Sequence, residues 1–130
     1  MEDREMPNSC WLLADEWAEE VNKLTERFRE GYMTFRIQLL SLDLCANGFL
    51  PHVDKQTIHL ALQRQSNGLA DGALSVSLPE SEEANYWKCA NESGEVFLSV
   101  EYRLRDSTAK IEIATSEDFF YLVTGEARKQ

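Results

Sequence analysis

Residues 10–42 read CWLLADEWAEEVNKLTERFREGYMTFRIQLLSL, and their apolar side chains recur at alternating gaps of three and four. At about 100° per residue, a helix would bring these side chains into one sector roughly 100° wide. The stripe consists of Cys10, Leu13, Ala14, Trp17, Val21, Leu24, Phe28, Tyr32, Phe35, Leu39 and Leu42. It predicts a long N-terminal amphipathic helix over about residues 9–46, capped by Asn8 or Ser9 and ended near Gly48.

The second half of this stretch admits two interpretations. Residues 33–39 alternate apolar and polar side chains, which is typical of a half-buried strand, and Gly31 is a natural break. The alternation changes phase at Leu39 and Leu40, whereas the helical stripe keeps its phase, so a helix is preferred over residues 32–46. Such a helix has a second apolar row made of Met33, Ile37, Leu40 and Leu44. An exposed row of this kind predicts contact with a second copy of the chain, and therefore a homodimer.

Beyond Pro51 the periodicity changes to two, which predicts antiparallel strands. The predicted strands cover residues 57–63, 73–78, 86–89, 95–105 and 109–115. Residues 117–123 fit either a strand or a short helix capped by Ser116 and ended by Gly125. The fold class is therefore α+β, with the long helix packed on an antiparallel sheet of four to six strands. Residues 1–8 are expected to be a flexible tail, and residues 9–130 a single domain.

Charge selects a register for the hairpin formed by the strands at 95–105 and 109–115. A turn at Ser107 and Thr108 places Arg103 opposite Glu112, whereas a turn one residue earlier sets like charges opposite each other. The first register is preferred. Phe97 lies on the mostly polar face of its strand, so either that face is partly covered or Phe97 is an exposed contact.

The chain has 130 residues, of which 23 are acidic and 13 basic, giving a net charge of −10 with histidine neutral. Binding to a phosphate backbone requires clustered Lys and Arg, so direct nucleic-acid binding is not expected. The acidic surplus favours solubility or a protein partner with a basic surface. No stretch approaches roughly 18 uninterrupted apolar residues, and the acidic N-terminal residues do not form a secretory signal. A cytoplasmic protein without membrane contact is expected.

Catalytic and metal-binding patterns are weak. The two histidines, His52 and His59, have a spacing that fits no metal signature, and the three cysteines form no C-x-x-C pair. Cys10 and Cys45 lie among apolar residues and are expected to be buried. The sequence thus predicts no catalytic residue, cofactor or metal site, and the chain is not expected to be an enzyme.

These features favour a non-enzymatic acidic protein-binding module of the adaptor, chaperone, immunity or inhibitor type, acting as a dimer. The residues expected to contact the partner are Met33, Ile37, Leu40, Leu44, Phe97, Glu82 and Glu83. One alternative is a small-ligand-binding or minor enzymatic domain, with a pocket lined by aromatic side chains such as Trp87, Phe97 or Phe119. Another is a subunit of a larger assembly that uses the helix in a coiled coil.

Overall fold

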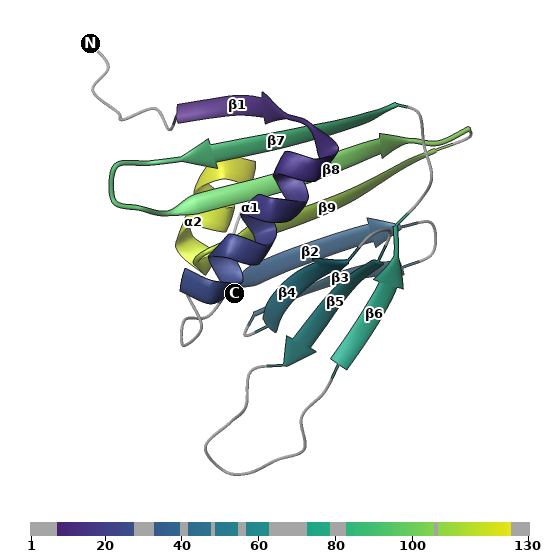
Figure 1. The fold of residues 1–130 in the computed structure, drawn as a ribbon, viewed down its shortest axis with the longest axis horizontal. Coiled ribbons are helices and arrows are strands. Elements are labelled where there is room, and N and C mark those ends of the chain that lie inside the picture. Colours follow the sequence, from purple (N-terminus) through teal and green to yellow (C-terminus); the bar gives the residue numbers. More distant parts are fainter. Residues whose placement is uncertain are drawn as a thin grey trace.

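The computed structural model describes two helices and nine strands within the part of the chain that it covers. That part comprises residues 8–27, 33–39, 42–47, 49–54, 57–62, 73–78, 83–105 and 107–125. Figure 1 shows a large sheet, with a smaller sheet beside it. Within the same ranges, no helix is long and apolar enough to cross a membrane.

The large sheet contains six strands. They are β1 (Asn8–Leu12), β2 (Thr34–Leu39), β3 (Leu42–Asn47), β7 (Ala84–Ala90), β8 (Val96–Arg103) and β9 (Thr108–Ala114). Their order is β1-β7-β8-β9-β2-β3, and all neighbours are antiparallel. Side chains alternate between the two faces along each strand, so each face collects its own set of residues.

The small sheet contains β4 (Phe49–Asp54), β5 (Thr57–Leu62) and β6 (Ala73–Ser77), which are antiparallel in that order. The strands predicted at 57–63 and 73–78 are confirmed as β5 and β6. The α+β class and the antiparallel sheet are also confirmed, although the strands divide into two sheets.

The first helix, α1 (Ala14–Arg27), is much shorter than the helix predicted over residues 9–46. The prediction was wrong on both sides of α1, because β1 precedes it and β2 and β3 occupy residues 34–39 and 42–47. The predicted break at Gly31 lies outside the described residues, as do residues 1–7 of the predicted tail. Asn8, the last residue of that tail, is the first residue of β1.

The strand interpretation of residues 33–39 prevails because β2 finds partners on both sides. Phe35 lies opposite Ile113 of β9, and Ile37 lies opposite Ile111, so the alternating apolar residues meet apolar residues of a distant segment. The change of phase at Leu39 marks the end of β2, where Leu39 pairs with Leu42 of β3. The change of phase, which favours a helix when the sequence is considered alone, therefore marks a hairpin.

The helix α1 begins after Leu13 rather than at the predicted cap. The Leu13 backbone N–H donates to Glu16 Oε1 at 2.8 Å, and the Trp17 N–H donates to the Leu13 carbonyl at 2.9 Å. Glu16 thus reaches back to the helix start as in a capping box. From α1 and the α1 side of the large sheet, the buried core includes Trp17, Val21, Leu24, Phe35, Ile37, Leu98, Val100, Ile111 and Ile113.

Polar side chains of α1 close the outer edge of β4. Asn22 donates from Nδ2 to the Val53 carbonyl at 3.1 Å, and its Oδ1 accepts from the Val53 N–H at 2.9 Å. Thr25 Oγ1 donates to the Pro51 carbonyl. Pro51 has no N–H to satisfy, which suits an edge position. The edge of β4 is thereby paired with side chains of the same chain instead of being open to another strand.

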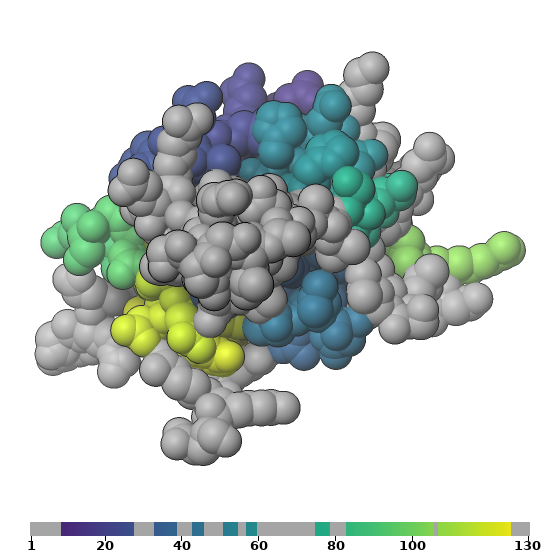
Figure 2. Space-filling model, turned by 90° about the horizontal axis from the view of Figure 1, so that it is seen from below, coloured from purple at the N-terminus to yellow at the C-terminus, as the bar shows by residue number. Residues whose placement is uncertain are grey.

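The second helix, α2 (Glu117–Thr124), lies on the other face of the large sheet. Ser116 Oγ accepts from the Phe119 N–H at 3.1 Å, and Gly125 ends the helix with a φ of 75°. The helical alternative for residues 117–123 is confirmed, with its predicted cap and end. The buried cluster between α2 and the sheet contains Cys89, Phe97, Ala114, Phe119 and Phe120. In the space-filling view of Figure 2, α2 (yellow) lies on the opposite side from α1 (dark blue) and the small sheet (teal).

The hairpin of β8 and β9 has a different register from the predicted one. Arg103 lies opposite Thr108 rather than Glu112. Opposite charges still face each other, because Glu101 lies opposite Lys110. The prediction was wrong because the predicted and observed registers, which differ by a shift of two residues on each strand, both keep the apolar side chains on one face. Both also place opposite charges across from each other, so these criteria cannot choose between them.

Candidate functional site

The face of the large sheet that carries α2 is only partly covered by that helix. One row across four strands consists of Trp11, Trp87, Ser99 and Glu112, each directly opposite the next. The adjacent row consists of Asn85, Glu101 and Lys110. On the α2 face, these rows therefore consist of aromatic, polar and charged side chains. On the α1 face, the rows of the same strands consist mainly of apolar side chains.

An aromatic ladder, made of Trp11, Trp87, Phe97 and Phe120, runs across this face. The ring centroids are 6.5 Å apart for Trp11 and Trp87, 5.9 Å for Trp87 and Phe97, and 6.0 Å for Phe97 and Phe120. Phe97 and Phe120 are buried between α2 and the sheet, whereas Trp11 is 70% exposed. The ladder therefore has a fixed, buried end and an end open to solvent.

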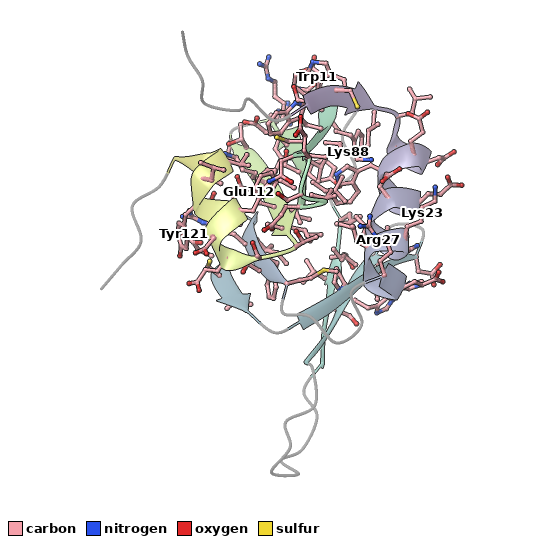
Figure 3. All side chains as sticks on the ribbon, turned by 90° about the vertical axis from the view of Figure 1, so that its left-hand side faces the viewer. Trp11, Lys23, Arg27, Lys88, Glu112 and Tyr121 are labelled. Carbon is pink, nitrogen blue, oxygen red and sulfur yellow. The ribbon has the colours of Figure 1, made fainter. Side chains whose placement is uncertain are left out.

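A cleft of about 320 Å³ lies on this face, beside the open end of the ladder. It is lined by Trp11, Asn85, Trp87, Phe97, Ser99, Glu101, Lys110, Glu112, Val123 and Thr124. Its volume lies at the lower end of the roughly 300–1,000 Å³ range of small-molecule sites. Figure 3 shows Glu112 on the side of the sheet that faces α2, whereas Lys88 lies toward α1, where its Nζ is 3.0 Å from Glu20 Oε1.

The charged side chains of the cleft are two carboxyl groups and one amine. Glu112 is only 7% exposed and lies deep in the cleft, whereas Glu101 is exposed and Lys110 is half-buried opposite Glu101. Arg36 of β2 lies opposite Glu112, and its Nε is 3.6 Å from Asp43 Oδ1. The lining itself carries a surplus of negative charge, in a chain whose net charge is −10.

The structure does not bring the predicted partner-binding residues together on one surface. Met33 and Ile37 are buried in the core on the α1 face, and Leu44 is partly buried against that core. Leu40 and Glu82 lie outside the described residues. The row of Met33 and Ile37 was expected to be exposed on a helix, and this was wrong because both lie in the strand region and are buried in the core on the α1 face of the large sheet.

The two remaining predicted residues have different surroundings. Glu83 is exposed, and its Oε1 lies 3.6 Å from Nε of Arg103, which is also exposed. An exposed ion pair of this kind contributes little to stability. Phe97 is 2% exposed and lines the cleft, so the first of its two predicted alternatives is correct: its face is partly covered.

Sequence reasoning identified Trp87 and Phe97 as candidate pocket residues and missed most of the others. Trp11 was missed because the helical stripe placed it off the apolar face, although β1 aligns it with Trp87. The alternation of residues 95–105 already assigned Ser99 and Glu101 to the polar face. Only the pairing of β8 with β7 and β9 makes that polar face part of a cleft.

The histidines and cysteines lie outside the cleft lining. His59 Nδ1 is 2.8 Å from Ser75 Oγ, and the His52 ring stacks on His59 with centroids 6.4 Å apart. This contact is exposed on the small sheet. Among the described residues, no three His, Cys, Asp or Glu side chains are grouped closely enough to hold a metal ion.

Cys10 and Cys45 are exposed, contrary to the prediction, because β1 and β3 are the two edge strands of the large sheet. Cys89 is buried beneath α2, and this burial raises the pKa of its thiol. A buried thiol with a raised pKa is a poor nucleophile.

Comparison of the chain with protein-family models, curated proteins and solved structures found no match. Its function is therefore inferred from the cleft, the side chains that line it and the charge of the chain.

Proposed function

We propose that this chain is a non-enzymatic, acidic protein-binding module that holds a basic partner at the cleft on the α2 face. The observation that carries the proposal is the exposed indole of Trp11 beside Trp87, in a cleft that also contains Glu101 and Glu112. Tryptophan is enriched among the residues that dominate binding energy at protein interfaces. An indole that is 70% exposed loses contact with water when a partner covers it, and this favours association.

The charge of the chain supports the choice of a basic partner. A net charge of −10 attracts basic surfaces over distances of about 10 Å at moderate salt and accelerates their association. The carboxyl groups of Glu101 and Glu112 extend the negative electrostatic potential of the chain into the cleft. Binding should therefore weaken as salt is added.

A homodimer is not needed for this proposal. The dimer was expected from an exposed apolar row, but Met33 and Ile37 of that row are buried within the chain itself. The apolar stripe of α1 is likewise buried in the same chain, so a coiled coil through this helix is not proposed.

The burial of Glu112 favours a second candidate function, the binding of a small molecule in the same cleft. A carboxyl group at 7% exposure, with Ser99 opposite it on β8 and Arg36 opposite it on β2, is suited to orienting one polar group of a ligand. Native mass spectrometry of the purified chain tests this candidate. A bound small molecule that is absent from the Trp11→Ala variant would favour it over a protein partner.

Co-purification from the organism that encodes the chain tests the leading proposal. Tagged wild-type protein is compared with Trp11→Ala and with Leu13→Ala, a control whose side chain is equally exposed (71%) and does not line the cleft. We expect a basic protein to be retained by the wild type and by Leu13→Ala, lost from Trp11→Ala, and released by salt. Retention of the same proteins by all three forms would contradict the proposal.

A further inference from the structure

We infer that the cleft is a receptor for an arginine side chain, and that the basic partner inserts its guanidinium group there. This inference rests on the proposed function and names the chemical group that the cleft recognises. It follows from three properties of the lining: its charge, its aromatic surface and the amine of Lys110.

The charge of the lining favours a cation over an anion. Within the lining, Glu101 and Glu112 supply two carboxyl groups and Lys110 supplies one positive charge. Outside the lining, Arg36 lies opposite Glu112, and the carboxyl group of Asp43 balances the charge of Arg36, so a surplus of one carboxyl group remains. An anion would meet both carboxylates and the field of a chain with a net charge of −10. A cation meets oxygen acceptors at the buried floor, where electrostatic attraction is stronger than in water.

The aromatic surface favours a guanidinium group over an ammonium group. Trp11 and Trp87 are tilted by 47° with centroids 6.5 Å apart, so the two rings contact each other and leave no slot for a cation between them. The exposed face of Trp11 remains available, since this side chain is 70% exposed. A planar guanidinium stacks on an indole face and also donates in a fork to a carboxylate, whereas a compact, strongly hydrated ammonium does neither as well.

Lys110 is a competitor within the chain. Its side chain lines the cleft and lies opposite Glu101 in the β8–β9 register, so its ammonium group lowers the attraction that an incoming cation meets. Removal of this charge should strengthen binding. A lysine with only a structural role would not give this result, because its loss would leave binding unchanged or weaken it.

Titration of the full chain with Nα-acetylarginine amide, followed by NMR, tests the inference directly. The chain has three tryptophans, and their indole N–H signals report separate places. We expect the signals of Trp11 and Trp87 to shift with a Kd in the range of about 1–10 mM, as befits a single side chain. Trp17 is buried on the α1 face and serves as the internal control. The matched ligand is Nα-acetylcitrulline amide, which has the same shape without the charge.

Four variants sharpen the test. Glu101→Gln and Glu112→Gln should each weaken binding about three- to tenfold, and Lys110→Gln should strengthen it about threefold. Glu101 is exposed, so its variant remains informative even if Glu112→Gln folds poorly. The control is Glu19→Gln, which makes the same change of charge at an exposed position of α1.

The outcomes separate the inference from the function on which it rests. Equal shifts with the citrulline ligand, tighter binding of the corresponding lysine amide, or equal weakening by Glu19→Gln would overturn the inference. A basic partner that depends on Trp11, combined with no response to arginine amide, would leave the proposed function standing and remove the inference. Arginine binding in the cleft without any basic protein partner would contradict the proposed function alone.

Discussion

The two faces of the large sheet are built from the same strands and differ in almost every other respect. On the α1 face, β8 presents Leu98 and Val100, which are completely buried. On the α2 face, the same strand presents Ser99 and Glu101, which line a cleft. Among the described elements, α1 and the small sheet close one face, and α2 alone covers part of the other.

With the proposed binding at the cleft, this difference assigns stability to one face of the sheet and recognition to the other. The closed face buries enough apolar surface to hold the strands in place. The open face can then carry charged and aromatic side chains that would be costly in a core, because the rigid sheet fixes their positions.

A large difference in stability is expected between substitutions of two neighbouring residues of β8 that point to opposite faces. Leu98→Ala should lower the free energy of unfolding by about 2–5 kcal/mol, since it leaves a cavity in the closed face. Ser99→Ala should change it by about 0.5 kcal/mol or less, as a substitution outside the core does. Urea denaturation measures both values. Equal losses would show that the two faces are packed alike.

The polar attachment of α1 to β4 should have a smaller effect. Asn22→Ala removes two hydrogen bonds and leaves the Val53 N–H and carbonyl without these partners, which costs about 1–3 kcal/mol. Lys23→Ala, at the next and exposed position of α1, is the control. The Val53 amide should also exchange with solvent faster in Asn22→Ala. An unchanged exchange rate would mean that Asn22 does not protect this edge.

Alkaline pH should weaken the closed face through Tyr102. Burial, together with the neighbouring Tyr86, raises the pKa of Tyr102 above its ordinary value of 10.0, so the folded state favours the neutral phenol. This stabilisation is complete below pH 10 and is lost as the pH rises further, because the unfolded chain ionises first. The expected loss is about 1.4 kcal/mol per pH unit.

The Tyr102→Phe variant isolates this contribution. Urea denaturation at about pH 9 and about pH 11 should show a smaller loss of stability in the variant than in the wild type, by roughly 1 kcal/mol. Identical pH dependences would contradict the raised pKa of this tyrosine.

Only a small change in stability is expected from Trp11, in contrast to the same residue type on the closed face. Trp11→Ala should cost about 1 kcal/mol or less, since the side chain is mostly exposed and, among the described residues, its ring packs on that of Trp87 alone. Trp17→Ala should cost about 3–5 kcal/mol. Thermal denaturation of the two variants compares the faces directly. A Trp11→Ala variant as unstable as Trp17→Ala would show that the open face also holds the fold together.

Local sequence patterns were sufficient to predict α1 and β8. The stripe of Trp17, Val21 and Leu24 identified the buried face of α1, and the alternation around Leu98 and Val100 identified β8. The residues of β2 were misassigned because Phe35, Leu39 and Leu42 satisfy a helical period and part of a strand period at once. What decides between them is the pairing of β2 with β9, a segment that lies far along the chain.

The cleft was less predictable than the fold. Trp87 and Phe97 could be named because aromatic side chains at strand spacing are visible in the sequence. Glu112 could not, since nothing local distinguishes a carboxyl group at 7% exposure from a solvated one. Its burial depends on α2 and on the strands at either side, which are joined only in the folded chain.

The strand order has a consequence for synthesis on the ribosome. The segments β1, α1 and β2 precede the other described elements, but β1 pairs with β7 (Ala84–Ala90) and β2 pairs with β9 (Thr108–Ala114), so each finds its inner neighbour only after those later strands have been synthesised. The hairpins β2–β3 and β4–β5 can close locally in the meantime. The segment β7–β9 then inserts between β1 and β2, and α2 follows it in the sequence. The face that carries α2 is thus completed only after β7, β8, β9 and α2 have all been synthesised, later than either local hairpin.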